Sequence, residues 1–341
     1  MNDSLFGLDT MNAPWGLQSR VKLAALACDF FSVKKTAANH AAVGKELPVK
    51  RNPEPLTGRD FLNYLKIKKF FPKPPSALRV AEMIGRMASS GLLVSIGHSE
   101  PSIAGLGNHY LYALTVWEAR RDLFRLVPAL GPEYLFDLCA PGLVHITGTS
   151  ENGIEVAGTG LVIGARHVLT CRHVLTDMEV SGTQKIQGRE YVVEERSLYL
   201  HPEIDVAVIQ VKGAPLSPLK GAIFQAPVVA QSVYTLGYPK LPGLRDASVI
   251  MQKGAVTNER VTSLAGERLF LYSAISRPGN SGGPVMSHDG YVLGLSIMDA
   301  IGEYDAGNAF SPHYAGIPSQ VVVAAVRDLD LGIELPFEKY E

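Results

Sequence analysis

The chain has 341 residues and a formal net charge of −1, with 46% hydrophobic and 19% charged residues. This length predicts two domains, and this composition excludes a chain dominated by disorder. The charge is unevenly divided, because residues 1–140 hold 17 Lys and Arg against 12 Asp and Glu, a balance of +5, and the remainder holds 15 against 21, a balance of −6. Opposite signs indicate two domains with different partners. The excess over residues 1–140 is too small to imply nucleic-acid binding by itself.

The N-terminal sequence and the cysteines predict a cytoplasmic protein. The first residues, MNDSLFGLDTMNAPWG, contain neither a basic segment nor an apolar run, so we expect no secretory signal. We also expect no transmembrane helix, because no apolar run is long enough. Cys28, Cys139 and Cys171 cannot all pair, and a secreted domain would be expected to hold more disulfides. No set of His, Cys and carboxylate residues has metal-ligand spacing, so neither a metal nor another cofactor is expected.

Residues 1–56 are predicted to form a helix followed by a linker. Apolar residues recur at helical spacing between Pro14 and Ala42. Residues 45–58, KELPVKRNPEPLTG, are charged and rich in proline, which is typical of a linker.

Residues 57–140 are predicted to form a second, helical unit. Thr57 and Ser76 are each placed to cap a helix, and the second helix is expected to end near Gly91. Two apolar runs with strand character follow, joined by a turn-rich segment: Leu92–Ile96 and Tyr110–Thr115. The order helix, helix, strand, loop, strand resembles that of winged-helix domains, which implies a regulatory or interaction module. A helix interrupted near Gly131 is expected to connect this unit to the rest of the chain.

From Gly142 onward the sequence changes to short strand-like runs. Examples are GLVIG, DVAVIQV and YVLGLSIM, and turn residues separate them at short intervals. Such a succession predicts an all-β barrel or sandwich. Only Pro318–Leu329 returns to helical periodicity, so we expect a closing helix there.

Three segments of this β-rich region carry reactive residues. They are VLTCRHV with His173, HPEIDVAVI with Asp205, and GNSGGP at positions 279–284 with Ser281. The order His, Asp, Ser along the chain is that of the chymotrypsin arrangement. Over about residues 142–330 the sequence resembles the trypsin-like serine peptidases. Within them it is similar to the compact bacterial HtrA (Deg) branch.

This resemblance implies a peptidase domain over residues 141–335. The implied fold is a chymotrypsin-type double six-stranded antiparallel β-barrel with a C-terminal helix. His173 would take the proton of the Ser281 hydroxyl, and Asp205 would orient the imidazole. The backbone N–H groups of Gly279 and Ser281 would form the oxyanion hole. The implied reaction is hydrolysis of a peptide bond through an acyl-enzyme intermediate.

Two neighbouring residues compete for the same roles. His167 precedes an apolar strand, whereas His173 ends the run that matches the family's histidine segment. Asp177 lies only four residues after His173, which is too close for a strand-separated partner, so we assign it to a turn. The other histidines that we considered are interpreted as surface or loop residues: His201, His288 and His313.

The residues around Ser281 predict how substrate is selected. Asn280 stands where digestive relatives have an aspartate that pairs with a new N-terminus, so that route of activation is not expected. Ile275 and Ser276 offer no carboxylate, so cleavage after Arg or Lys is not favoured. The opposite wall is predicted to consist of Ser296, Ile297 and Met298. We expect a small or medium apolar side chain at the cleaved position, although Asp299 leaves a basic one open.

The N-terminal half is expected to recognise a partner. HtrA relatives usually carry a C-terminal PDZ domain and act outside the cytoplasm, whereas here the extra domain comes first. Six basic residues in it could meet phosphates: Lys66, Lys68, Lys69, Lys73, Arg79 and Arg86. The alternative, which we favour, is a solvated basic face on a protein-docking or autoinhibitory module.

Three functions follow from these expectations. The first is an intracellular serine endopeptidase that cleaves a specific protein and is regulated by its N-terminal domain. Bacterial peptidases of this kind act in stress response and antiphage defence, and no contact with a membrane is expected. The alternative is a DNA-bound regulator whose peptidase cleaves itself or a repressor, which salt-dependent DNA binding would reveal. The third is an inactive interaction scaffold, against which the intact triad counts.

Overall fold

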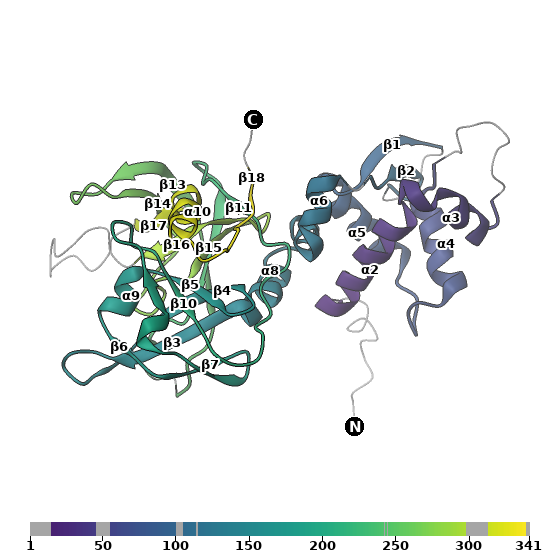
Figure 1. Ribbon diagram of the computed structural model, residues 1–341. Coiled ribbons are helices and arrows are strands. Elements are labelled where there is room, and N and C mark those ends of the chain that lie inside the picture. The colour runs from purple at the N-terminus through teal and green to yellow at the C-terminus, as the bar shows by residue number, and fades with distance from the viewer. Residues whose placement is uncertain are drawn as a thin grey trace, which may run out of the picture. The chain divides into compact units, whose positions relative to one another are not determined.

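The structure is a computed structural model that describes residues 15–45, 55–99, 105–113, 115–241, 243, 245–297 and 313–338. The chain divides into two compact units. One comprises the residues up to Arg120 together with Arg125–Tyr134, and the other comprises Arg121–Phe124 together with Leu135 onward. Figure 1 shows that the first is α-rich and the second β-rich. Within the described ranges, no helix is long and apolar enough to span a membrane. The predicted boundaries at residues 56 and 140 stay predictions.

The α-rich unit begins with helices whose starts are encoded locally. Its elements are α2 (Leu17–Phe30), α3 (Thr36–Ala42), α4 (Gly58–Lys68), α5 (Ala77–Ser89), β1 (Val94–His98), β2 (Asn108–Leu111) and α6 (Val116–Arg120). Thr57 and Asp60 form a capping box at the start of α4, in which each side chain accepts the other residue's N–H. Ser76 caps α5 by accepting the N–H of Arg79. Both helix starts are therefore where the sequence predicts them.

The core of this unit is aromatic. Rings from α2, α4 and β2, with the residue that follows α2, contact one another with centroids 4.8–5.6 Å apart: Phe30, Phe31, Phe61, Tyr64 and Tyr110. β1 and β2 form an antiparallel pair, and Thr57 bridges to His109 on β2. The element order is the one predicted, whereas the winged-helix identity of the unit stays a prediction.

The connection between the units is divided into four short helical segments. They are α6, a 3₁₀ turn at Asp122–Leu126, α7 (Val127–Leu130) and α8 (Pro132–Cys139). The predicted interruption is present, because Gly131 adopts a φ of +84° and Pro132 starts α8.

The β-rich unit contains one closed antiparallel barrel. Its strands are β12 (Ser232–Gly237), β13 (Ile250–Thr262), β14 (Arg268–Tyr272), β15 (Pro284–Ser287), β16 (Val292–Ile297) and β17 (Tyr314–Pro318). They follow the order β15-β12-β13-β14-β17-β16, and the additional pairing of β15 with β16 closes the barrel. β11 (Phe224–Gln225) pairs in parallel with β16, and β18 (Phe337–Glu338) pairs in parallel with β11. The predicted closing helix is α10 (Ser319–Asp328), which packs against β16 and β17.

The other strands form a curled sheet that stays open, so the prediction of two closed six-stranded barrels is wrong for this half. Its strands are β3 (Leu143–Thr149), β4 (Glu155–Gly164), β5 (His167–Thr170), β6 (Glu179–Val180), β9 (Leu198–Leu200) and β10 (Ala207–Gln210). They follow the order β6-β3-β4-β5-β10-β9, and within the described residues no pairing joins β6 to β9.

A side chain explains why the pairing beside β3 stops. After β6 the chain turns into a separate hairpin, β7 (Thr183–Ile186) with β8 (Arg189–Val192). The buried amide of Gln184 accepts the N–H of Thr147 on β3 at 3.1 Å and donates to the Thr147 carbonyl at 2.8 Å. The Thr147 carbonyl also accepts the N–H of Ser181 at 3.0 Å, so Gln184 is needed mainly for the Thr147 N–H, and β3 has no main-chain group there that requires another strand.

Candidate active site

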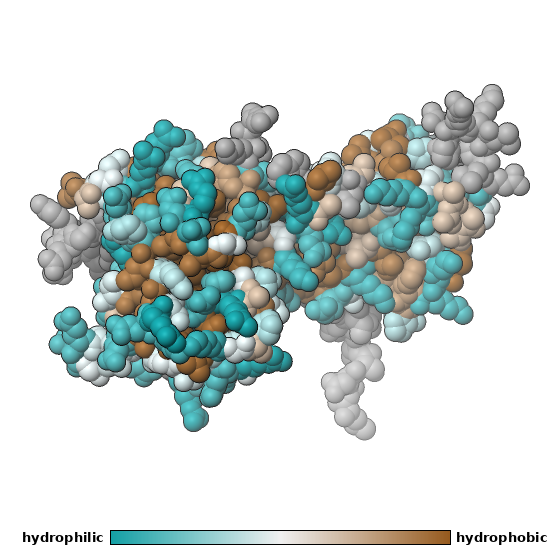
Figure 2. All heavy atoms as spheres, in the orientation of Figure 1, coloured by the Kyte–Doolittle hydropathy of each residue, from teal (hydrophilic) through white to brown (hydrophobic). Residues whose placement is uncertain are grey.

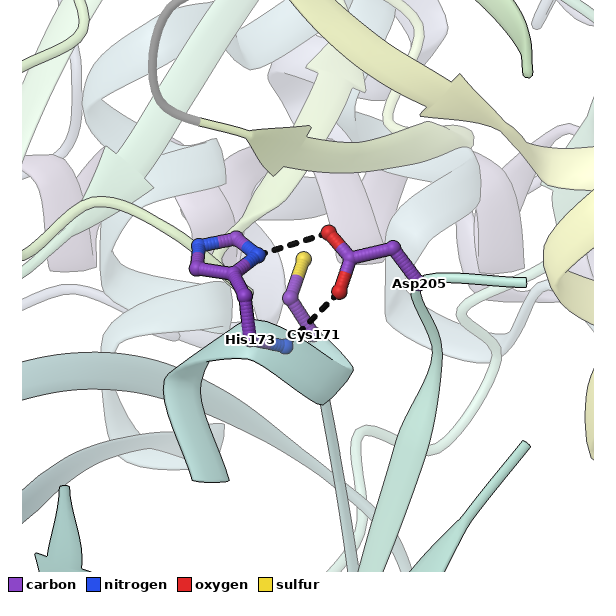
Figure 3. Close-up of side chains that lie close together, drawn as sticks. All are labelled: Cys171, His173 and Asp205. Carbon is purple, nitrogen blue, oxygen red and sulfur yellow. Dashed lines mark hydrogen bonds and ion pairs between the residues drawn. The ribbon is translucent and has the colours of Figure 1, made fainter. Parts of the chain in front are cut away.

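His173 and Asp205 are brought together by one pair of strands. His173 lies in α9 (Arg172–Thr176), just after β5, and Asp205 lies just before β10. These strands are antiparallel, with Thr170 opposite Ala207, so the two residues reach the same end of the sheet. Figure 3 shows the imidazole and the carboxylate facing each other.

The Asp205 carboxylate holds His173 at two points. Its Oδ2 accepts a hydrogen bond from Nδ1 of the ring at 2.6 Å, and its Oδ1 accepts one from the backbone N–H of His173 at 2.8 Å. Because a carboxylate can only accept, the proton of the neutral ring is on Nδ1. Nε2 is therefore left with its lone pair, as a general base requires.

The loop that carries Asp205 is organised by residues to which the sequence analysis gave no role. Nη1 of Arg172 donates to the carbonyls of His201 and Pro202, at 3.1 and 2.7 Å. Nδ1 of His201 accepts the N–H groups of residues 203 and 204, at 3.1 and 2.9 Å. His201 is a loop residue, one of the two alternatives given for it, and it is buried, with only 6% exposed. The position of His201, four residues before Asp205, was the sequence signal that could have indicated a role in shaping the Asp205 loop.

The pKa of His173 is raised above its ordinary value of 6.5. Burial alone lowers the pKa, because it penalises the charged ring. The hydrogen bond to Asp205 and the charge of that carboxylate more than offset burial, and Asp177 and Glu267 add to the rise. The positive form of the imidazole is therefore stabilised at this position.

Cys171 lies beneath this pair (Figure 3). Ligand atoms of Cys171, His173 and Asp205 lie within 4.8 Å of one another, which by distance alone could suit a metal ion. Burial, with a smaller contribution from Asp205, raises the pKa of the Cys171 thiol well above its ordinary value. The thiol also donates a weak hydrogen bond to the carbonyl of Ser296 at 3.5 Å. A protonated thiol is a poor metal ligand, so this arrangement favours a packing role for Cys171.

The Ser281 turn lies against the strands that lead to His173. The carbonyl of Ser281 accepts the N–H of Thr159 on β4 at 2.8 Å. Gly282 is so close to the chain that a Cβ there would be 3.0 Å from the nitrogen of Cys171, two residues before His173. Within the described residues, His173 and Ser281 share no hydrogen bond. Such contacts are often long without substrate and tighten when it binds.

The peptide groups that precede Gly279 and Ser281 are fixed through their carbonyls. The carbonyl of Pro278 accepts the N–H of Lys240 at 2.8 Å, and that of Asn280 accepts a main-chain N–H three residues later at 2.9 Å. In a trans peptide the N–H points away from the carbonyl. The N–H groups of Gly279 and Ser281 therefore point away from these partners, and within the described part of the chain neither makes a hydrogen bond. This is the pair predicted for an oxyanion hole.

A buried hydroxyl network lies behind the predicted substrate wall. Oγ of Ser296 is 2.8 Å from the Tyr272 hydroxyl and 2.9 Å from Oγ of Ser276. Ile297 on β16 is buried and Ile275 is exposed. Tyr272 was not predicted from the sequence, because its role depends on strand pairing that its local sequence does not indicate. Two residues considered for this wall, Met298 and Asp299, lie outside the described residues.

The two competing residues lie elsewhere. His167 is at the start of β5, opposite Gln210, whereas His173 follows the end of that strand. Burial, with a contribution from Arg166, lowers the pKa of His167. Asp177 directly follows α9, where its carboxylate accepts a hydrogen bond from the hydroxyl of Thr176 at 3.2 Å.

Comparison with known families adds to this geometry. Residues 158–295 match the family described as trypsin-like peptidase domain. This range includes His173, Asp205 and Ser281. The chain contains a trypsin-like peptidase domain. No curated protein is similar enough in sequence to match the chain.

Several solved structures are similar to the peptidase domain. The active form of the Rv3671c protease from M. tuberculosis is 21% identical, covers 59% of this chain and 86% of its own, and gives a TM-score of 0.46. A serine endoprotease from Yersinia pestis is 19% identical over 59% of this chain and 67% of its own, with a TM-score of 0.45. The HtrA-type protease AlgW with a tripeptide is 18% identical over 58% of this chain and 62% of its own, with a TM-score of 0.47.

Proposed function

We propose that the peptidase domain is an active serine endopeptidase with His173, Asp205 and Ser281 as its triad. The observation that carries this proposal is the double contact of Asp205 with His173, which leaves Nε2 of the neutral ring unprotonated. The N–H groups of Gly279 and Ser281 support it, because neither makes a hydrogen bond within the described residues, and unbonded donors are what a developing negative charge requires.

The reaction proceeds in two halves. Ser281 Oγ attacks the carbonyl carbon of the scissile peptide while His173 Nε2 takes the hydroxyl proton. The carbonyl oxygen becomes an oxyanion between the N–H groups of Gly279 and Ser281. The C–N bond then breaks as His173 returns the proton to the leaving amine, which leaves an acyl ester on Ser281. Water, deprotonated by His173, hydrolyses this ester and restores the hydroxyl.

A fluorophosphonate probe tests this proposal, because it reacts covalently with an activated serine. Wild-type protein should be labelled, and the Ser281→Ala variant should not. Peptide turnover in Ser281→Ala should fall by about a million-fold, and adding a His173→Ala change should lower it little further. Absence of labelling in wild-type protein, in the presence and absence of a denatured protein substrate, would contradict the proposal.

The substrate groove is proposed to accept an apolar side chain at the cleaved position. Ile275 and Ile297 supply apolar surface, and the hydroxyls behind them carry no charge. A cavity of about 550 Å³ lies beside Asp205 and extends to Ile297 and α10. Glu203 and Glu267 also line it. This cavity is suited to a neighbouring substrate residue that is apolar or basic.

The N-terminal unit is proposed to recognise a protein that regulates or delivers the substrate. Apolar side chains are exposed on α4, α5 and β1: Ile67, Leu78, Val94 and Ile96. Figure 2 shows apolar surface on this unit among polar residues. Part of its basic charge is used internally, because Arg79 lies 5.4 Å from the Trp15 ring and Arg86 pairs with Glu82 at 2.8 Å. These contacts favour a protein partner over nucleic acid.

A role in bacterial defence or stress response is proposed on the resemblance alone. The proposed compartment is the cytoplasm, and the cysteines fit a reducing environment because all three are buried free thiols.

A further inference from the structure

Thr159 on β4 contacts the predicted oxyanion turn on both sides of Asn280. Its N–H donates to the carbonyl of Ser281 at 2.8 Å, and its hydroxyl donates to the carbonyl of Gly279 at 2.6 Å. The same hydroxyl accepts the N–H of Tyr238 at 2.9 Å. Thr159 is fully buried, so water does not compete for these bonds.

These contacts fix the peptide planes on either side of the Asn280–Ser281 peptide. The Gly279 carbonyl belongs to the preceding plane and the Ser281 carbonyl to the following one, and Thr159 holds both. The plane between them carries the Ser281 N–H, so its rotation is restricted from both ends. The Asn280 side chain contributes less, because its buried Oδ1 has no hydrogen-bond partner within the described residues.

The surroundings leave the Thr159 side chain no room to turn. A Cβ at Gly237 would be 2.8 Å from its hydroxyl oxygen, and a Cβ at Gly283 would be 3.2 Å from its methyl carbon. A Cβ at Gly282 would be 2.3 Å from its carbonyl oxygen. Glycines therefore pack against Thr159 from both sides, and the hydroxyl is held in one orientation between Tyr238 and Gly279.

From these contacts we infer that Thr159 is a positioning residue that keeps the oxyanion hole formed before substrate binds. The inference rests on the proposed peptidase function. Thr159 acts through Gly279 and Ser281 and does not touch the substrate, so its loss should affect the transition state more than substrate binding.

Thr159→Val tests this inference, because valine keeps the shape and removes the hydroxyl. We expect kcat to fall about 10-fold to 100-fold while KM changes less than about twofold, since small misplacements of catalytic groups have effects of this size. Thr159→Ser should restore most of kcat. A peptide aldehyde, whose bound form places an oxyanion in the hole, should lose affinity in Thr159→Val by about the same factor as kcat.

Thr170→Val is the matched control. Thr170 is equally buried, and its hydroxyl donates to the carbonyl of Thr159 at 2.8 Å without reaching Gly279. We expect its kcat to stay within about threefold of wild type. Equal losses in Thr159→Val and Thr170→Val, or an unchanged kcat in Thr159→Val, would overturn the inference. If Thr159→Val does not fold, Thr159→Cys replaces it, because cysteine keeps a weak donor of similar shape. Its kcat should lie between that of wild type and the value expected for Thr159→Val.

The amide NMR signal of Gly279 separates failure of this inference from failure of the proposed function. Thr159→Val should shift that signal, and Thr170→Val should leave it near its wild-type position, whether or not the protein is active. If fluorophosphonate does not label the wild-type protein, the peptidase proposal is refuted. The Gly279 amide signal still decides the role of Thr159 in that case. An unshifted Gly279 signal in Thr159→Val would refute the inference even if fluorophosphonate labels Ser281.

Discussion

The two contacts from Asp205 to His173 have opposite consequences for stability and for catalysis. The raised pKa of His173 means that the charged pair stabilises the fold most below the ordinary imidazole value of 6.5. This stabilisation is lost as pH rises through the raised pKa. Catalysis requires the neutral ring, so the turnover rate rises over the same pH range in which the stabilisation from the charged pair is lost. The pH dependence of turnover should therefore report on the groups that raise this pKa.

A pH profile of kcat/KM checks this reasoning. The acid limb of the wild-type profile should lie above pH 6.5, because His173 must lose a proton from a stabilised charged form. Glu267→Gln removes one of the charges that raise the pKa, so it should move the acid limb to lower pH. The control is Glu259→Gln, an exposed change on β13, which should leave the limb in place. An acid limb at the same pH in Glu267→Gln as in wild-type protein would contradict the assignment of that limb to His173 and the charges around it.

At the scale of elements, hydrogen bonds from side chains decide where strand pairing begins and ends. Gln184 on β7 occupies both main-chain groups of Thr147 and also donates to the carbonyl of Ser181 at 3.0 Å. Its side chain is almost fully buried, so the Thr147 N–H depends on it and not on water, while the Thr147 carbonyl also accepts the N–H of Ser181. The open edge of β3 in the curled sheet is thereby blocked for pairing with a further strand. The edge of β3 is protected although this sheet does not close into a barrel.

Gln184→Ala should destabilise the peptidase domain. It leaves the N–H of Thr147 without this buried partner, which costs about 1–3 kcal/mol, whereas the Thr147 carbonyl keeps the N–H of Ser181 at 3.0 Å. For a unit of this size, a loss of about 2 kcal/mol corresponds to a fall in Tm of roughly 4–8 °C. Lys185→Ala, the exposed neighbour on β7, should change Tm by less than about 2 °C. Calorimetry of both variants provides the measurement, and equal Tm values would show that Gln184 has no such role.

At the scale of the whole molecule, the peptidase unit includes a short piece of the connecting segment. Arg121 is buried, its guanidinium lies 4.0 Å from the ring centroid of Tyr291, and its Nη2 donates to the carbonyl of Asp289. A Cβ at Gly221 would be 2.2 Å from the carbonyl oxygen of Arg121. Asp289 and Tyr291 lie in the turn between β15, which follows Ser281, and β16. Within the peptidase unit, the turn between β15 and β16 therefore holds Arg121 in place.

Arg121→Ala should release this segment. Loss of the cation–π contact and of a buried charge-assisted hydrogen bond should lower the free energy of unfolding of the peptidase unit by about 2 kcal/mol. Trypsin should then cleave the connecting segment after Arg120 and Arg125 faster than in wild-type protein. Arg260→Ala, which removes an exposed arginine on β13, is the control and should show wild-type cleavage. Unchanged cleavage in Arg121→Ala would show that the segment is held by other contacts.

Prediction from sequence succeeded where the signal is local and failed where distant segments meet. Thr57 and Ser76 start helices because their side chains reach an N–H three residues away. His173 and Asp205 could be paired from their segments, because each follows or precedes a recognisable strand. The open first sheet, the buried His201 and the Tyr272 network depend on partners that the local pattern does not specify.

The sequence alone therefore determined the helix starts, the β-rich nature of residues 142 onward and the three residues proposed for the triad. Tertiary structure alone decided which barrel closes, which peptide groups of the Ser281 turn remain available, and that Thr159 holds that turn. The physical reason is distance along the chain. Thr159 and Gly279 are 120 residues apart, and only strand pairing brings the hydroxyl of one to the carbonyl of the other.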